Sequence, residues 1–150
     1  MKRVVVDASV VLAGLFKDGT VRDVLLNAED LSFSAPLYLR EEVEKQLARV
    51  ASRAGIPRET VESVLEDILG AIDLVPSGVY SASLDLARRL AKRAEAVGDA
   101  DYIALCLALE APVWTLDKDF DRVPGLRVLR TKDVDAAQVM RDQAASHIRR

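Results

Sequence analysis

The sequence has few of the residues on which several common kinds of site depend. Its 150 residues include one cysteine, Cys106, and one histidine, His147. A single cysteine cannot form a disulfide within the chain, and it excludes a zinc site built from several cysteines. No apolar stretch approaches the roughly 18–20 residues that a membrane-spanning helix needs. We therefore expect a cytoplasmic protein that makes no membrane contact.

Positive charge is not in excess either, because the formal net charge is −3. This balance argues against a protein held to nucleic acid mainly by its overall charge. It does not exclude a nuclease, because clustered carboxylates add negative charge that bound cations would offset. One local group of basic residues stands out: Arg88, Arg89, Lys92 and Arg93. The simpler interpretation is a solvated helix face, and the functional one is contact with an RNA backbone.

Apolar residues make up 50% of the sequence, which is enough for the core of one domain. The first residues, two of them basic and followed by an apolar stretch, superficially resemble a secretion signal. Asp7 interrupts that stretch, and no small-residue cleavage site follows it. We interpret this segment as the first strand of the fold.

Short apolar runs alternate with longer segments of helical periodicity along the chain. This pattern predicts strands at residues 4–6, 31–34, 72–75, 112–115 and 126–129. It predicts helices at residues 9–15, 20–28, 36–53, 58–71, 80–96 and 100–109, and from 133 onward. Such alternation indicates an α/β fold with a mostly parallel five-stranded sheet covered by helices on both faces.

Acidic residues recur where predicted strands end. Asp7 directly follows the first strand and Asp117 the fourth, so both belong at the carboxyl edge of the sheet, where ligands gather. Asp99 begins the helix that leads into the fourth strand, and Glu41 and Glu42 lie early on the helix after the second. Each residue alone has an ordinary explanation, such as a helix cap, a turn or an exposed helix position. Their convergence is more specific.

Converging carboxylates repel one another, and a hard divalent cation relieves that repulsion. Without a cysteine set, an all-oxygen site suits Mg²⁺ or Mn²⁺. Such a cation binds a phosphate oxygen, activates water and stabilises transition-state charge. The chemistry that this pattern indicates is hydrolysis of a phosphodiester bond.

Three segments resemble the signature blocks of PIN domains, in the order and with the spacing of that family. They are residues 4–11 (VVVDASVV), 98–105 (GDADYIAL) and 114–120 (WTLDKDF). Residues 35–43 resemble the family's second motif, a glutamate just before an apolar residue. The resemblance covers essentially residues 2–130.

This resemblance implies a three-layer α/β/α nuclease domain at residues 1–130, with residues 131–150 as its helical extension. It implies that Asp7, Glu42, Asp99 and Asp117 are the catalytic carboxylates, with Asp7, Asp99 and Asp117 binding metal. Glu42 fits the motif better than Glu41. Ser9, Asp101 and Asp119 would have supporting roles.

The expected activity is that of a Mg²⁺- or Mn²⁺-dependent endoribonuclease. Many relatives are VapC-type toxins, so an antitoxin partner and a homodimer are also expected. The alternative is a non-catalytic module of the same fold that binds RNA or protein. Two other classes fit less well. Ser9 stands where a haloacid-dehalogenase-type phosphatase needs a second aspartate, and the glycine-rich loop of a nucleotide-binding module does not follow the first strand.

Overall fold

A computed structural model describes residues 2–16 and 19–135. Its sheet contains five parallel strands in the order β3-β2-β1-β4-β5. The strands are β1 (Lys2–Val6), β2 (Leu31–Pro36), β3 (Ile72–Val75), β4 (Val113–Trp114) and β5 (Val128–Leu129). The α-helices are α1 (Ala8–Phe16), α2 (Gly19–Asn27), α3 (Leu39–Ala54), α4 (Arg58–Gly70), α5 (Leu84–Arg93) and α6 (Ala100–Leu109). Short 3₁₀ helices are η1 (Ser77–Val79), η2 (Ser81–Ser83), η3 (Val97–Asp99) and η4 (Lys118–Arg122).

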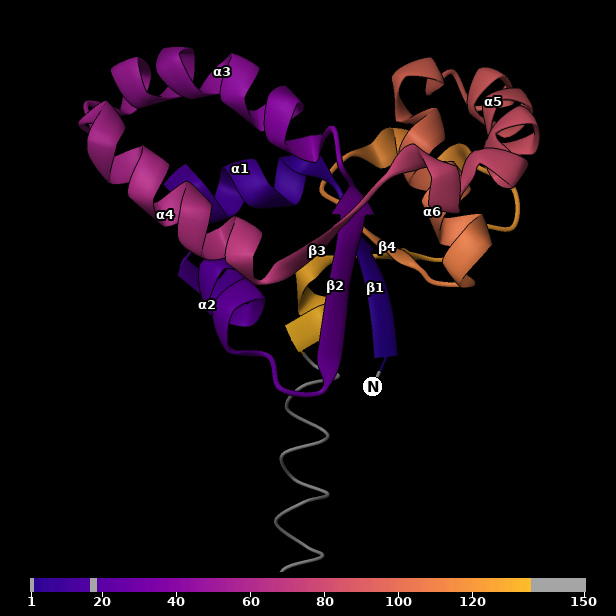
Figure 1. Ribbon diagram of the computed structural model, residues 1–150, viewed down its shortest axis with the longest axis horizontal. Coiled ribbons are helices and arrows are strands. Elements are labelled where there is room, and N and C mark those ends of the chain that lie inside the picture. Colours follow the sequence, from indigo (N-terminus) through magenta and orange to yellow (C-terminus); the bar gives the residue numbers. More distant parts are fainter. Residues whose placement is uncertain (1, 17–18, 136–150) are drawn as a thin grey trace, which may run out of the picture.

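The helices form two groups on opposite sides of the sheet (Figure 1). Helices α1 to α4 pack on one another on one side, while α5 and α6 pair on the other, with α6 against β1, β2 and β4. The expected α/β fold with a parallel five-stranded sheet and helices on both faces is therefore confirmed. Within the described residues, no helix combines the length and the apolarity that crossing a bilayer requires.

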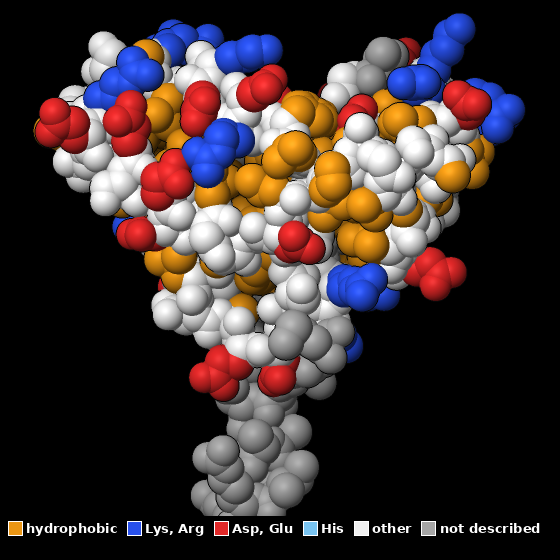
Figure 2. Space-filling view, viewed as in Figure 1, with side chains coloured by type: hydrophobic (Ala, Val, Ile, Leu, Met, Phe, Trp, Pro, Cys, Tyr) orange, Lys and Arg blue, Asp and Glu red, His pale blue; other side chains and the backbone are white. Residues whose placement is uncertain are grey.

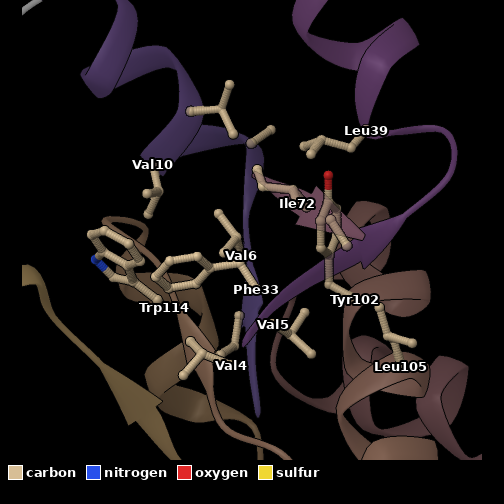
Figure 3. Close-up of a cluster of buried hydrophobic side chains, with 14 of the residues drawn as sticks. Val4, Val5, Val6, Val10, Phe33, Leu39, Ile72, Tyr102, Leu105 and Trp114 are labelled. Atoms are coloured by element: carbon tan, nitrogen blue, oxygen red, sulfur yellow. The ribbon is translucent and has the colours of Figure 1, made fainter. Parts of the chain in front are cut away.

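The central strand β1 alternates its side chains between the two helical layers, as strand geometry requires. Figure 3 shows Val4 and Val6 on the side of Trp114, and Val5 on the side of Tyr102 from α6. All five side chains are buried. A parallel strand covered on both faces must be apolar throughout, which explains the unbroken valine run.

Two predicted helix starts are wrong. Pro36 does not open a helix: it is the last residue of β2, in register with Val75, and the Leu37 N–H donates to the Val75 carbonyl (2.8 Å). A proline is tolerated at that strand end, and α3 begins only at Leu39. The helix predicted at 80–96 is shorter, because η1 and η2 precede it with Tyr80 buried between them.

Strands β4 and β5 are also shorter than the strands predicted at residues 112–115 and 126–129, although each lies within its predicted range. At the C-terminal end, residues 131–135 are helical as expected. The rest of the predicted extension, residues 136–150, lies outside the described residues.

Replacing Trp114 with alanine should destabilise the fold strongly. The Trp114 ring is fully buried and packs against Phe33 with ring centroids 5.8 Å apart. Loss of such a side chain costs about 3–5 kcal/mol of unfolding free energy, which urea denaturation followed by circular dichroism measures. Leu107→Ala, at a side chain 36% exposed, is the control and should cost much less. Equal destabilisation by both changes would contradict this picture of the core.

Candidate active site

Asp7 is the buried centre of the site. It directly follows β1 and has 5% of its surface exposed. Its Oδ2 atom accepts hydrogen bonds from the hydroxyls of Ser9 (2.7 Å) and Thr115 (2.8 Å). Burial raises the pKa of Asp7, while these hydroxyls and the backbone N–H groups of Ala8 and Ser9 oppose that rise. The carboxylate is therefore held in one orientation by four donors.

Thr115 joins the ends of β1 and β4. Its side chain is fully buried, and its hydroxyl oxygen also accepts a hydrogen bond from the Asp117 backbone N–H (2.9 Å). The Asp117 carboxylate then accepts from the Asp119 N–H (2.9 Å), which starts η4. The Ser9 hydroxyl in turn accepts from the Leu116 N–H (3.1 Å). This chain of hydrogen bonds fixes Asp117 relative to Asp7.

The electrostatic environment of Asp99 shows that the acidic side chains lie near one another. It stands at the start of α6, yet its side chain makes no capping hydrogen bond with that helix. Burial and the charges of Asp7, Asp117 and Glu42, together with that of Asp119, raise the pKa of Asp99 to about 7. Carboxylates from four distant segments therefore share one electrostatic environment.

Glu42 projects from the first turn of α3 and is held by two tyrosines. The Tyr102 hydroxyl donates to Glu42 Oε1 (3.3 Å), and the Tyr38 hydroxyl is also hydrogen-bonded to this carboxylate. The two rings meet edge to face, with centroids 5.7 Å apart. Burial raises the pKa of Glu42, and the charge of Asp7 raises it further. Glu41, in contrast, is exposed.

The predicted supporting residues are placed differently from one another. Ser9 hydrogen-bonds a carboxylate, as its predicted role requires. Asp119 forms an ion pair with Arg122 (2.7 Å) beside the cluster. Asp101 accepts a hydrogen bond from the buried Tyr80 (2.7 Å), and this contact ties α6 to the segment before α5.

The basic group that the sequence suggested for RNA contact lies on α5. All four side chains are exposed. Arg88 lies 3.7 Å from Asp85, one turn earlier on the same helix. Within the part of the chain that the structure describes, no hydrogen bond or ion pair joins Arg89, Lys92 or Arg93 to the acidic cluster.

The donors at this site fit a hard divalent cation. They are all carboxylate and hydroxyl oxygens, the ligands that Mg²⁺ and Mn²⁺ prefer. Among the described residues, no group of three or more His, Cys, Asp or Glu side chains is already arranged to hold a metal ion. Burial is the largest cause of the raised pKa of Asp99, and the repulsion by neighbouring carboxylates that adds to it is what a cation would relieve. Asp7, Asp99 and Asp117 are the side chains that would bind it.

Sequence reasoning missed three side chains that shape the site. Thr115, Tyr38 and Tyr102 each orient an acidic residue through a hydroxyl. One signal was present for Thr115: it is a polar residue inside an apolar strand, two positions before Asp117. The two tyrosines gave no such signal, because a tyrosine in or next to a predicted helix is readily explained as an ordinary packing residue.

The comparisons with known proteins concern the family and the fold. A family model described as PIN domain matches residues 5–139. The fold is similar to a chain in the crystal structure of VapBC2 from Rickettsia felis bound to a DNA fragment from their promoter. The TM-score is 0.66 at 15% sequence identity, over 85% of this chain and 98% of that chain.

A second similar structure is PAE2754 from Pyrobaculum aerophilum. Its TM-score is 0.63 at 17% identity, and the match covers 93% of this chain and 88% of that chain. No curated protein sequence gives a significant match.

In the absence of divalent cations, the protein should lose stability as pH rises from about 4 to about 7. In this window Asp99 is ionised in the unfolded chain, where its pKa is 3.8, but protonated in the folded chain, where it is about 7. The folded state then binds more protons, so the unfolding free energy falls with rising pH. The raised pKa values of Asp7 and Glu42 act in the same direction.

Urea denaturation in EDTA at several pH values measures this effect. Asp99→Asn should flatten the fall, whereas Asp67→Asn, at an exposed position on α4, should keep the wild-type profile. If the unfolding free energy of Asp99→Asn falls with pH as steeply as that of the wild type, ionisation of Asp99 does not cause the loss of stability.

Replacing Thr115 with valine should loosen the junction between Asp7 and Asp117. The change keeps the shape of the buried side chain but removes the hydroxyl that Asp7 and the Asp117 N–H both use. Leaving such buried groups unpaired costs about 1–3 kcal/mol. Thr115→Ser retains the hydroxyl and should recover most of the stability in thermal unfolding. If serine is no better than valine, packing of the methyl group explains the loss instead.

Proposed function

The chain belongs to the PIN-domain family, and from this premise we propose that it is a metal-dependent endoribonuclease that hydrolyses RNA phosphodiester bonds. One observation carries the proposal: three other segments bring carboxylates beside Asp99, where burial first and the charges of Asp7, Asp117 and Glu42 next raise its pKa to about 7. A structural role does not explain why uncompensated negative charge gathers at the edge where α/β sheets bind ligands.

Mg²⁺ or Mn²⁺, held by Asp7, Asp99 and Asp117, would supply Lewis-acid stabilisation of the charge that develops on the phosphate. The protein's part is to position its acids. Asp7 is held by the hydroxyls of Ser9 and Thr115, and the Asp117 carboxylate by the Asp119 N–H in the turn that follows. This fixed geometry avoids reorganisation during the reaction.

Glu42 is the carboxylate best suited to orient the attacking water. It is half-buried, and the hydroxyls of Tyr102 and Tyr38 fix its direction without neutralising it. Its raised pKa makes it a stronger proton acceptor than an exposed glutamate. We assign it to water positioning for this reason, and the α5 cluster of Arg88, Arg89, Lys92 and Arg93 to contact with the RNA backbone.

The same proposal extends to biological context. Similarity in fold to a chain of the VapBC2 structure supports a toxin that pairs with an antitoxin protein. A homodimer is also proposed, because the exposed Leu37 and Val79 follow the neighbouring strands β2 and β3, of which β3 is at the sheet edge. Figure 2 shows apolar side chains gathered in the middle of the visible face, where Figure 1 shows the carboxyl end of β2.

Asp7→Asn should abolish RNA cleavage while preserving the fold, because it keeps the shape of the side chain and removes its charge. The assay incubates structured and unstructured RNAs with Mg²⁺ or Mn²⁺, against EDTA. Losing an interaction worth several kcal/mol at the transition state slows cleavage by about 100-fold or more. Asp67→Asn, an exposed carboxylate on α4, is the matched control and should cleave like the wild type.

Two outcomes would count against this function. Wild-type cleavage by Asp7→Asn would remove Asp7 from the mechanism. If the wild type shows neither cleavage nor Mn²⁺ binding by calorimetry, the chain is a non-catalytic module that binds RNA or protein.

A further inference from the structure

The basic residues of α3 fall into two groups. Arg40 forms an ion pair with Glu66 of α4 (2.6 Å), so its charge is compensated within the fold. Lys45, Arg49 and Arg53 are exposed, and none of them takes part in the ion pairs found among the described residues. We call these three residues the α3 basic row.

The α3 basic row continues along the helix from the active site. At about 100° per residue, Arg49 and Arg53 lie within about 20° of Glu42 around the helix axis, and Lys45 within about 60°. The row extends about 12 Å along the axis from Lys45 to Arg53. Lys45 is close enough to Glu42 for its charge to lower the pKa of that carboxyl.

A groove of about 320 Å³ lies between α1 and α3, and its lining residue on α3, Val50, directly follows Arg49 of the row. Its lining residues are Ser9, Leu12, Ala13, Phe16, Val50 and Leu116. Ser9 is the residue whose hydroxyl donates to Asp7, so one end of the groove opens at the acidic cluster. The other lining side chains are apolar, and Phe16 offers a half-buried aromatic ring.

Figure 2 shows a notch between the arm formed by α3 and α4 and the arm that carries α5. Lys and Arg side chains lie along the upper edge of the α3 arm, and β2 points toward the notch in Figure 1. The carboxyl edge of the sheet, where the acidic residues converge, is thus at the base of the notch.

We propose that the groove between α1 and α3 holds a single strand of the RNA substrate next to the cleavage site. In this arrangement Lys45, Arg49 and Arg53 contact successive phosphates, and Phe16 stacks on a base. The inference rests on the proposed ribonuclease function and adds the path of the substrate over named residues of this chain.

The chemistry of the groove favours a single strand over other occupants. Proteins that bind single strands combine a positively charged track for the backbone with aromatic side chains on which bases stack. Here Phe16 lines the groove, and the α3 basic row lies on the helix whose Val50 lines it. A duplex keeps its bases paired and would leave the apolar floor empty. Three exposed cations in one row, none of them in an ion pair among the described residues, also suit a polyanion better than a mixed-charge protein surface.

The test measures binding of a labelled, unstructured RNA oligonucleotide in EDTA, so that no cation-dependent cleavage occurs. The test variant carries Lys45→Gln, Arg49→Gln and Arg53→Gln. The matched control carries Lys2→Gln, Arg3→Gln and Arg127→Gln, which remove the same charges from exposed positions around a pocket at the opposite edge of the sheet. An RNA hairpin is the duplex probe.

The α3 variant should lose about tenfold or more of its affinity for the single strand, because it loses three phosphate contacts. The slope of log affinity against log salt should fall by about 2, since each contact to a single strand contributes about 0.7. The control variant should keep the wild-type slope, and the hairpin should bind weakly to all proteins. Phe16→Leu should lose at least about fivefold in affinity with no change in slope, because it removes a stacking surface and no charge.

Several results would overturn the inference. Equal losses in the α3 and control variants would mean that only overall charge matters. Wild-type affinity of the α3 variant would exclude the groove, even if Asp7-dependent cleavage confirms the ribonuclease. Equal loss of affinity for polyglutamate and for RNA would indicate a surface for an acidic protein segment instead. Conversely, selective loss of RNA binding without any cleavage activity in the wild type would support the groove and reject the catalytic proposal.

Discussion

The buried carboxylate of Asp7 at the end of the central strand is the constraint around which this structure is organised. A charge with 5% exposure is costly unless several donors hold it. Ser9 supplies one donor from α1, and Thr115 supplies another from the segment after β4. These bonds join the first and fourth strands at the edge where the other acids arrive. Removing the donors would weaken the link between the two strands and also release the carboxylate from its orientation. Stability and site geometry therefore depend on the same contacts.

Glu42 is a half-buried carboxylate that, like the buried Asp7, is held by hydroxyl donors. Tyrosine has an apolar ring and a polar tip, so Tyr102 can be fully buried and still donate to a carboxylate. Its ring also packs edge to face on Tyr38 and on Phe120 of η4. The aromatic cluster thus holds the ends of α3, α6 and η4 next to one another at the site. The acidic residues are therefore positioned by packing in the core.

The sequence predicted the strands and the acids that follow them well, because both signals are local. The valine run that ends in Asp7 marks a buried parallel strand and its edge without reference to any partner. What depends on distant partners was not predictable. Pro36 matches a helix start as well as a strand end, and only its pairing with Val75 decides between them. Tyr102 looks like a core residue until Glu42 comes within reach of its hydroxyl, and Thr115, although polar in an apolar strand, does not by itself indicate Asp7 as its partner.

The basic residues illustrate the same limit in electrostatics. The α5 cluster was noticed because its members are nearly contiguous, whereas Lys45, Arg49 and Arg53 are spaced by four and form a row only on a helix. The formal net charge of −3 does not indicate that acidic residues gather at the base of a notch while basic residues line its side. A phosphate backbone would be repelled by the acids alone, so a basic row on the helix that carries Glu42 lets attraction act beside the reaction centre. Salt then screens the approach of the substrate, whose contacts are exposed, far more than it affects the buried carboxylates that would perform the chemistry.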